Sequence, residues 1–288
     1  MTSLTAKACS DMSDFNISVV IPVHNRAKLI TRALDSVLAQ TIPAQEVIIV
    51  DDGSTDNNLS DVLTKYQDKI VLIQQENLGV SAARNIGIQQ ATGNWIALLD
   101  SDDSWQINKL EQQVAVLSAK PDYKLCHTNE TWYRDGEELM QKKKHEKKGG
   151  FIFQNCLPLC VISPSSVLIE RTLFDEVGLF DETLPACEDY DLWLRICCRY
   201  PVLFIDEPLT NKFGGHDDQL SRKYWGMDRF RIVALHKCIQ HEPLNALDRE
   251  AAINMLLEKI DIFLKGAEKH GNTDEARRFE QLKQQYSQ

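Results

Sequence analysis

The sequence predicts an α/β fold in which a Rossmann-like, mostly parallel central sheet is flanked by helices and followed by a C-terminal helical extension. Two observations lead to this prediction. From Phe15 to about residue 120, short β-branched apolar runs alternate with amphipathic stretches, without tight hairpin turns between them, which is the pattern of β-α-β units. Beyond Tyr224 the sequence has helical character to its end, with breaks at Glu242-Pro243 and at Gly271.

Four short apolar runs are expected to form buried strands. The first, ISVVIP, is continuous, rich in β-branched residues and closed by a proline, which is typical of a strand covered on both faces. The expected strands are residues 17–22, 46–50, 69–75 and 95–99. Apolar residues at helical spacing predict helices between them at residues 29–38, 80–91 and 110–119.

The stretch 121–224 is less regular than the first part of the chain. Asp135-Gly136 suits a tight turn, so we expect two strands around it. The lysine-rich segment 142–148 is interpreted as a solvated loop, with contact to an anionic acceptor as the alternative. The remaining expected elements are strands at 165–170 and 202–206 and a helix at 189–200.

Composition limits the classes of protein that the chain can belong to. The 288 residues are 43% hydrophobic and 26% charged, as in an ordinary globular protein of one large or two small domains. The 32 basic and 42 acidic residues give a net charge of −10, so no general basic surface for nucleic acid is expected. No apolar run approaches the roughly 18 residues needed to span a bilayer.

The lack of a recognisable signal peptide and the distribution of the cysteines predict a cytoplasmic protein, in solution or at the cytoplasmic face of a membrane. The N-terminus lacks the basic and apolar regions of a signal peptide. The eight cysteines are scattered through apolar segments, so reduced thiols are expected. Cys156 and Cys160 are interpreted as buried thiols rather than metal ligands, because no second Cys/His pair with zinc spacing follows them.

Two of the expected strands run directly into acidic clusters. The strand at 46–50 is followed by DDGS, and the strand at 95–99 by DSDD. The carboxyl ends of parallel strands meet at one edge of the sheet, where open α/β sheets bind ligands. Converging carboxylates favour a hard divalent cation, Mg²⁺ or Mn²⁺, as their counter-ion. The alternative for either cluster alone is turn formation and helix capping.

Four motifs follow one another along the first part of the chain: VVIPVHNR, VDDGSTDNN, ENLGVSAARNIGIQQATG and LLDSDD. In this order and spacing they resemble the nucleotide-sugar half of family 2 glycosyltransferases of the GT-A fold. The resemblance covers residues 17–105 and continues more loosely to about residue 221, through FDETLPACEDYDLWLRI and GGHDDQLSR. It implies an inverting, metal-assisted transfer from a nucleotide-diphospho-sugar, with UDP favoured, to the hydroxyl of a saccharide or lipid-linked saccharide. Cell-surface polysaccharide or glycolipid synthesis is the implied setting.

With this resemblance, the chain is expected to have four parts. A flexible tail precedes a nucleotide-sugar-binding half and an acceptor-binding half of one GT-A domain, and a helical extension follows. Their expected bounds are 1–14, 15–120, 121–224 and 225–288.

The resemblance also implies residues for the nucleotide-sugar. Asp52 would accept the N3–H of a uracil-type base, because a carboxylate offers only acceptors. Arg84 would reach the ribose or the diphosphate; a surface guanidinium on a helix is the alternative. The full implied set is Pro22, Val23, His24 and Asn25 beside the base, with Asp51, Asp52, Arg84, Asp100 and Ser101.

The implied metal ligands and catalytic residues lie in two further motifs. Asp102 would be the principal ligand of Mn²⁺ or Mg²⁺, with Asp103 and His216 assisting, and the ion would neutralise the departing diphosphate. Asp189 would act as the general base toward the acceptor hydroxyl, and Glu188 would orient it or touch the acceptor. Capping of a helix by these acids, and a structural role for the histidine, are the alternatives.

Other functions fit the sequence less well. A haloacid-dehalogenase-type phosphatase needs Asp-x-Asp after the first strand, where this chain has Pro22-Val23-His24-Asn25. A dehydrogenase needs Gly-x-Gly-x-x-Gly after a strand, and a sugar nucleotidyltransferase a glycine-rich phosphate loop, and both are absent. A non-catalytic nucleotide-sugar-binding or scaffold protein that keeps the fold remains the alternative.

The C-terminal helices contain an apolar stripe outside the resemblance. It is wide enough to pack on the domain or on a partner, including a second copy of the chain. Peripheral contact with a membrane is less favoured, because the polar face mixes acids with lysines. The stripe consists of Leu257, Ile260, Ile262, Phe263 and Leu264.

Overall fold

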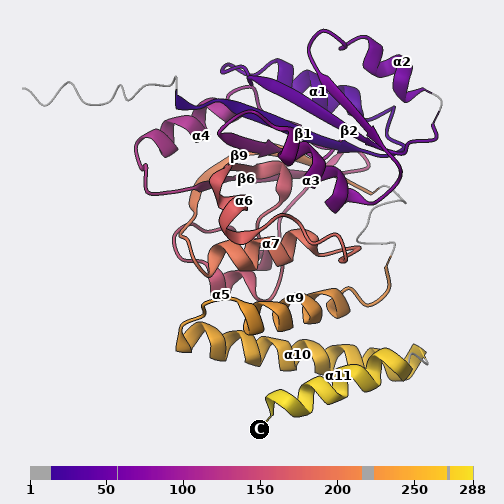
Figure 1. Ribbon diagram of the computed structural model, residues 1–288, viewed down its shortest axis with the longest axis vertical. Helices are drawn as coiled ribbons and strands as arrows, with labels where there is room; N and C mark the ends of the chain where they lie inside the picture. The colour runs from indigo at the N-terminus through magenta and orange to yellow at the C-terminus, as the bar shows by residue number, and fades with distance from the viewer. Residues whose placement is uncertain (1–13, 57, 216–223, 271–272, 288) are drawn as a thin grey trace, which may run out of the picture.

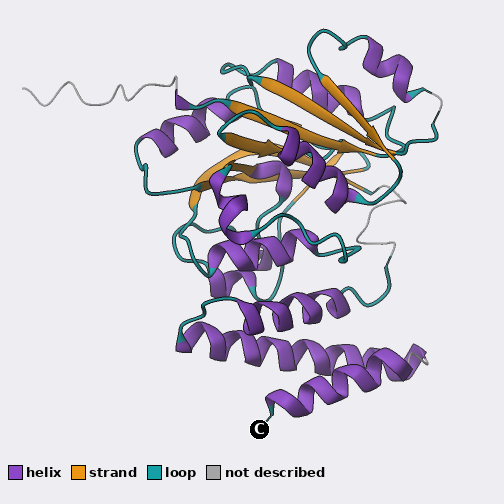
Figure 2. Ribbon diagram, in the orientation of Figure 1, coloured by secondary structure: helices purple, strands orange, loops and turns teal. Residues whose placement is uncertain are grey.

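The computed structural model describes residues 14–56, 58–215, 224–270 and 273–287. Its strands form one nine-stranded sheet in the order β3-β2-β1-β4-β8-β6-β9-β5, with β7 paired to β6. Buried apolar clusters lie on both faces of this sheet, beneath the flanking helices. The last three helices form a separate layer at one end of the molecule (Figure 1, Figure 2).

Four parallel strands form the first half of the sheet. β1 (Ile17–Val23) lies between β2 (Glu46–Asp52) and β4 (Trp95–Leu98), and β3 (Val71–Gln75) pairs with the outer side of β2. β1 is buried along its whole length, as its uninterrupted apolar sequence requires. Because the four strands are parallel, the loops that follow them emerge at the same edge of the sheet.

The helices that connect these strands pack on opposite faces. α1 (Ile30–Leu38) buries residues at helical spacing beginning with Ile30, in the same cluster as α2 (Leu59–Thr64) and α4 (Lys109–Ser118). α3 (Val80–Gln90) lies on the other face. It lies close to the sheet at Gly87. A Cβ added at this position would come within 2.3 Å of a methyl group of Val20.

The second half of the sheet is mixed. β8 (Val167–Glu170) joins the halves, because it runs antiparallel to both β4 and β6 (Leu125–Arg134). β9 (Leu203–Gly214) is parallel to β6, with a register shift around Asn129. Two short strands, β5 (Ser104–Trp105) and β7 (Glu137–Leu139), pair antiparallel with β9 and β6.

Short helices belong to this half, and two of them, α5 and α7, contact the C-terminal layer. α7 is almost entirely buried, with Tyr190 and Trp193 each 1% exposed. Their bounds are η2 (Lys143–His145), α5 (Phe153–Cys156), η3 (Pro164–Ser166), α6 (Thr172–Val177) and α7 (Glu188–Cys197). The C-terminal layer consists of α9 (Asp228–His241), α10 (Ala246–His270) and α11 (Thr273–Tyr286).

The C-terminal layer packs on the domain through α9. Ile232 and Leu235 of α9 belong to the same buried cluster as Trp193, together with Ile260 and Phe263 of α10. The expected apolar stripe of α10 is therefore used mainly inside the protein, although Ile262 remains 51% exposed. Among the described residues, no helix is both long and apolar enough to traverse a bilayer.

The structure confirms the α/β class and its helical extension. The expected hairpin is present, with Asp135 and Gly136 at φ 54° and 85° between β6 and β7. One expected element changes in extent: the strand predicted at 202–206 continues to Gly214, because it pairs with β6 although its sequence there is largely polar. The sheet is parallel throughout its first half and along β6–β9, and antiparallel around β8, β5 and β7.

Candidate functional site

The candidate site lies at the edge of the sheet where β1, β2 and β4 end. Contacts join the loops that follow these strands. His24 Nδ1 lies 2.8 Å from the backbone oxygen of Asp52, and Arg26 Nη1 lies 3.7 Å from Asp102 Oδ2. The N-terminus of α7 reaches the same place, because its Glu188 is linked to the loop after β4 through one arginine of α3. The motifs of four separate segments therefore meet at one edge.

Asn25 holds the loop after β1 against the loop after β2. Its backbone is left-handed, with φ 54°. Its Oδ1 accepts hydrogen bonds from the backbone N–H groups of Thr55 at 2.7 Å and Asp56 at 3.1 Å, and its own N–H donates to Ser54 Oγ. His24 and Asn25 are exposed.

Pro22 and Val23, which were expected to lie beside the base, are buried inside β1. Their side chains are buried at the end of the strand, so His24 and Asn25 are the exposed members of this part of the expected set, and the role of all four beside a base stays a prediction.

Asp52, at the end of β2, accepts three hydrogen bonds within the protein. Its Oδ1 accepts from Gln75 Nε2 at 2.7 Å and from the N–H of Leu78 at 2.8 Å, and its Oδ2 accepts from the N–H of Gly79 at 2.9 Å. A carboxylate has about four acceptor positions, so one remains for a ligand donor. Because it accepts from the N–H groups of Leu78 and Gly79, Asp52 also fixes the turn that leads into α3. Asp51 similarly accepts from the N–H of Ser54 at 2.9 Å.

Arg84 on α3 forms the central contact of the site. Nη2 lies 2.7 Å from Asp100 Oδ1 and Nη1 lies 2.7 Å from Glu188 Oε1, and the Arg84 side chain is only 4% exposed. Although burial opposes ionisation, Arg84 lowers the pKa of Asp100, while the two acids raise the pKa of Arg84 itself. Arg84 thus joins the two acidic clusters that the sequence places far apart, and does not extend toward open solvent.

Asp103 is buried and held on both oxygens. Ser165 Oγ donates to Oδ2 at 2.6 Å, the N–H of Phe213 donates to Oδ1 at 3.2 Å, and Lys212 Nζ lies 3.6 Å from Oδ2. Burial raises the pKa of Asp103 to about 7, against the opposing effect of Lys212. Ser101, in the same loop, is also buried, with 8% exposure.

Asp102 is more exposed than its neighbour Asp103. Its side chain is 18% exposed, and its Oδ2 lies 3.7 Å from Arg26 Nη1, farther apart than the atoms in the ion pairs of Arg84. Arg32 Nη2 donates to the backbone oxygen of Asp102 and so fixes the loop without occupying the carboxylate. Burial, together with Asp100, raises the pKa of Asp102. Asp102 is thus the acid of this loop that is best placed to accept a new ligand.

The sequence reasoning missed four residues that shape this loop. Arg26 and Arg32 flank the start of α1, and the Arg32 guanidinium lies 3.5 Å from the centre of the Phe213 ring. Lys212 and Ser165 come from β9 and η3. The two arginines had a signal, because HNRAKLITR follows directly on the first strand. Lys212 and Ser165 had none, because the strand that carries Lys212 was expected to end before it.

The N-terminus of α7 presents the proposed catalytic acids. Cys187, which precedes the helix, has φ 63°, a left-handed conformation that side chains rarely adopt. Burial and the neighbouring Asp189 raise the pKa of Glu188, whereas Arg84 lowers it. The half-buried Asp189 accepts on Oδ1 from the N–H of Tyr190 at 2.7 Å and on Oδ2 from Cys160 Sγ at 3.2 Å.

The carboxylates fit a metal ion that is shared with a ligand. Among the residues that the structure describes, no group of three or more His, Cys, Asp or Glu side chains could hold a metal by itself. His216 lies outside the described residues. Asp103 is less accessible than Asp102, because each of its oxygens already accepts a hydrogen bond inside the protein, and its part as a ligand stays a prediction. Asp102, with Asp100 beside it, suits a Mg²⁺ or Mn²⁺ that takes its other ligands from a diphosphate and water.

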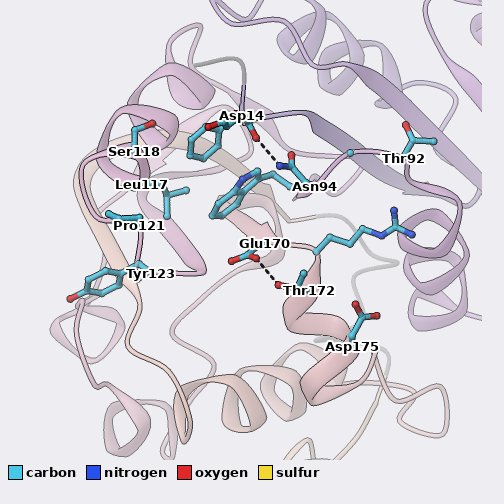
Figure 3. Close-up of a pocket in the computed structure, with 14 residues that line it drawn as sticks. Asp14, Thr92, Asn94, Leu117, Ser118, Pro121, Tyr123, Glu170, Thr172 and Asp175 are labelled. Atoms are coloured by element: carbon cyan, nitrogen blue, oxygen red, sulfur yellow. Dashed lines mark hydrogen bonds between the residues drawn. The ribbon is translucent and has the colours of Figure 1, made fainter. Parts of the chain in front are cut away.

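A separate cavity lies at the opposite edge of the sheet (Figure 3). It has a volume of about 620 Å³ and includes Trp95 at the start of β4 and Glu170 at the end of β8. Phe15 stacks on Trp95 with ring centroids 5.0 Å apart, and Tyr123 lines the same cavity. None of the expected site residues lines it. The candidate site is therefore the edge defined by the motifs and not this cavity.

Comparison with known proteins agrees with the geometry. The family described as Glycosyl transferase family 2 matches residues 18–178. The Escherichia coli protein named UDP-Glc:alpha-D-GlcNAc-diphosphoundecaprenol beta-1,3-glucosyltransferase WfgD is 32% identical over 186 residues, which cover 64% of this chain and 71% of that protein. The amylovoran biosynthesis glycosyltransferase AmsB of Erwinia amylovora is 32% identical over 233 residues, covering 74% of this chain and 76% of AmsB.

Longer relatives also match. An uncharacterized glycosyltransferase of Rickettsia felis is 37% identical over 219 residues, which cover 72% of this chain but 35% of that protein, so this chain spans only about a third of the length of such relatives.

Solved structures share the fold. The crystal structure of Staphylococcus aureus TarS 1-349 in complex with UDP-GlcNAc matches with a TM-score of 0.62 and 19% identity, over 94% of this chain and 92% of that one. At this identity the match supports the fold alone. The family match and the relatives together establish that the chain belongs to glycosyl transferase family 2.

Proposed function

We propose that the chain is an inverting glycosyltransferase that moves a sugar from a nucleotide-diphospho-sugar to a hydroxyl of a saccharide or lipid-linked saccharide. The observation that carries the proposal is the Arg84 bridge. It joins Asp100 of the donor motif to Glu188, the neighbour of the proposed base, through two contacts of 2.7 Å. A transferase needs its donor and its base at one place, and this bridge puts both motifs there.

A UDP-sugar is the donor we propose. The relative WfgD is named as a UDP-Glc-dependent enzyme, and TarS, which shares the fold, was crystallised with UDP and with UDP-GlcNAc. In this chain the remaining acceptor position of Asp52 would receive the N3–H of the base, and His24 and Asn25 would lie beside it. The basic side chains around the DSDD loop, Arg26 and Lys212 among them, would face the diphosphate.

Asp102, assisted by Asp100, would hold a divalent cation together with the diphosphate. A bound Mn²⁺ or Mg²⁺ would offset the negative charge that develops on the leaving nucleoside diphosphate. Two protein carboxylates are enough for this, because Mg²⁺ in phosphate sites usually takes its remaining ligands from the substrate and from water.

Asp189 is the base in the proposed reaction. It takes the proton of the acceptor hydroxyl while that oxygen forms its bond to the anomeric carbon. The bond from the anomeric carbon to the diphosphate oxygen breaks on the opposite face, and its electron pair leaves with the diphosphate. The configuration at the anomeric carbon is inverted as a result. Glu188, held by Arg84, keeps the start of α7 in place beside the base.

The names of two relatives support an acceptor class. WfgD is named for an acceptor with GlcNAc-diphosphoundecaprenol, and AmsB for amylovoran biosynthesis. We therefore propose a role in cell-surface polysaccharide or glycolipid synthesis, at the cytoplasmic face of the membrane where a lipid-linked acceptor would be present.

The test uses the purified chain, UDP-glucose, MnCl₂ or MgCl₂, and GlcNAc-diphosphate on a short alkyl chain as the acceptor probe. UDP release and glycosylated acceptor are measured together. We expect acceptor-dependent release of UDP that EDTA abolishes. Asp189→Asn should keep UDP-glucose binding in calorimetry and lose transfer. Transfer by Asp189→Asn at the wild-type rate would refute the assignment of the base.

A panel of other UDP- and GDP-sugars extends the same assay. Binding of a nucleotide-sugar without transfer or hydrolysis, with Asp189 intact and every donor and acceptor probe present, would favour a non-catalytic binding protein instead. The two outcomes differ in a single measured quantity, the release of nucleoside diphosphate.

A further inference from the structure

The proposed base, Asp189, is in contact with Cys160, a residue that has no part in the proposed reaction. Cys160 Sγ lies 3.2 Å from Asp189 Oδ2, while Asp189 Oδ1 accepts from the N–H of Tyr190 at 2.7 Å. One oxygen of the base is thus held by its own helix and the other by a segment from elsewhere in the chain. The carboxylate plane of Asp189 is fixed by these two contacts together.

The segment that carries Cys160 is anchored at three of its carbonyl groups. Tyr190 Oη donates to the oxygen of Leu157 at 2.6 Å, Lys259 Nζ to that of Pro158 at 2.9 Å, and Lys147 Nζ to that of Val161 at 2.8 Å. These donors come from α7, α10 and the segment after β7. Because the backbone is held on both sides of Cys160, its side chain has little freedom to leave Asp189.

The thiol has two acceptors and only one proton. Cys160 Sγ also lies 3.1 Å from the backbone oxygen of Ile162. Burial and Asp189 raise the pKa of the Cys160 thiol well above its usual value, so it remains a donor. With Asp189 ionised, the S–H donates to Oδ2. Once Asp189 has taken the acceptor proton, rotation about the Cβ–Sγ bond lets the S–H donate to Ile162 instead.

We propose that Cys160 is a positioning residue for Asp189, whose thiol orients the ionised carboxylate toward the acceptor and turns to Ile162 when the carboxylate becomes protonated. This inference rests on the proposed function, because it needs Asp189 to be the base. No proton or electron passes through the sulfur, and the reaction balance given above is unchanged.

The other groups around Asp189 do not duplicate this contact. Glu188 precedes it on α7 and is paired with Arg84 of α3. The thiol of Cys187 stays neutral, because burial raises its pKa to about 12. Glu188 is a like charge next to Asp189 and donates no hydrogen bond to it, whereas the thiol of Cys160 donates one to the Asp189 carboxylate.

Three variants test the inference with UDP-glucose and the alkyl GlcNAc-diphosphate probe. Cys160→Ala removes the donor, and Cys160→Ser restores a hydroxyl donor at the same position. Cys198→Ala is the matched control, because Cys198 is also half-buried but contacts the backbone oxygen of Arg195 and the carboxylate of Glu242, and not Asp189. Thermal unfolding of each variant shows whether it is folded.

For Cys160→Ala we expect kcat to fall by about three- to tenfold, the range of one lost hydrogen bond, with the KM for UDP-glucose unchanged. The acid limb of the kcat profile should move upward by about half a pH unit to one unit, because the ionised base has lost a donor. Cys160→Ser should return both quantities toward wild type, and Cys198→Ala should change neither.

The inference fails if folded Cys160→Ala keeps the wild-type kcat and acid limb. It also fails if Cys160→Ser is as impaired as Cys160→Ala, since the effect would then come from packing. These outcomes are distinct from failure of the proposed function, which would be shown by full transfer activity in Asp189→Asn. A dead Asp189→Asn with an unchanged Cys160→Ala would overturn the role of the thiol and leave the base in place.

Discussion

Arg84 Nη1 and Glu188 Oε1 lie 2.7 Å apart, although 104 positions separate the two residues in the chain. Arg84 Nη2 lies at the same distance, 2.7 Å, from Asp100 Oδ1. Its two terminal nitrogens thus connect the loop after β4 with the start of α7. The DSDD loop and the Glu188-Asp189 motif are therefore held together by the positive charge of Arg84.

Replacement of Arg84 is expected to damage both stability and activity. Arg84→Met would leave Asp100 and Glu188 without their counter-charge, and breaking a buried ion pair from one side costs about 3–5 kcal/mol. Arg84→Lys keeps the charge but reaches only one acid at a time, so it should be intermediate. Urea unfolding and UDP release measure the two effects. An unfolding free energy of Arg84→Met equal to that of wild type would contradict the bridge.

Neighbouring acids of the DSDD loop should behave differently when removed. Asp102→Ala is expected to abolish metal-dependent turnover while changing the unfolding free energy by less than about 0.5 kcal/mol, because the ion pair of its side chain with Arg26 is long and partly exposed. Asp103→Ala should lower the unfolding free energy by about 1–3 kcal/mol, because Ser165 and the N–H of Phe213 lose their buried acceptor.

Manganese titration by calorimetry in the presence of UDP, with urea unfolding in parallel, separates the two acids. The expected pattern is loss of manganese binding in Asp102→Ala without loss of stability. Loss of stability in Asp102→Ala, and not in Asp103→Ala, would reverse the assignment.

Ser165 is expected to support donor binding from outside the donor motif. Its Oγ donates to Asp103 at 2.6 Å and accepts from the N–H of Asp100 at 3.1 Å, so one fully buried hydroxyl ties both ends of the loop. Ser165→Ala should raise the KM for UDP-glucose by about three- to tenfold. Ser166→Ala is the control, because that buried hydroxyl donates to the backbone oxygen of Ser163. Equal effects of the two substitutions would argue against a specific role.

A buried lysine predicts a pH dependence of stability. Lys109 is 0% exposed and donates to Gln113 Oε1 at 2.8 Å, and burial lowers its pKa to about 7. An unfolded lysine has a pKa of about 10.4, so between about pH 7 and about pH 10 the unfolded chain binds more protons than the folded chain. The contribution of Lys109 to the unfolding free energy therefore rises with pH across this window, and is reduced below it.

Urea unfolding at pH 7 and pH 9.5 measures this contribution. Lys109→Met should remove a rise on the order of 1 kcal/mol per pH unit relative to wild type. Lys65→Met, at an exposed position, is the control and should leave the difference between the two pH values unchanged. A Lys109→Met variant with the wild-type pH dependence would show that the amine is charged in the folded protein.

Much of the architecture could be predicted because it is encoded locally. The uninterrupted apolar run of β1 has the signature of a strand buried on both faces, and Asp135-Gly136 has the φ > 0 preference that its hairpin needs. The position of both aspartate clusters followed from strand direction alone. β9 beyond residue 206 could not be predicted, because its polar residues are held in the sheet by pairing with β6 rather than by apolar periodicity.

The partners of the acids could not be predicted for the same reason. Asp102 and Asp103 are adjacent in sequence, yet only the structure shows that one is partly exposed and the other is enclosed by Ser165 and Lys212. Which cation meets which carboxylate depends on residues that tertiary packing brings together. The sequence therefore indicated a need for positive charge at this edge, but not that Arg84 supplies part of it.

The basic side chains at this edge determine how the affinity for the donor should depend on ionic strength. Four acids of the site face four cations, so this part of the edge is close to electroneutral; the acids are Asp100, Asp102, Asp103 and Glu188, and the cations are Arg26, Arg32, Arg84 and Lys212. A nucleoside diphosphate sugar that arrives with a divalent ion is close to neutral as well. Long-range attraction then contributes little to their encounter, and donor affinity should tolerate salt far better than that of a site built from lysines and arginines alone. Recognition at this edge is thus a matter of short-range fit.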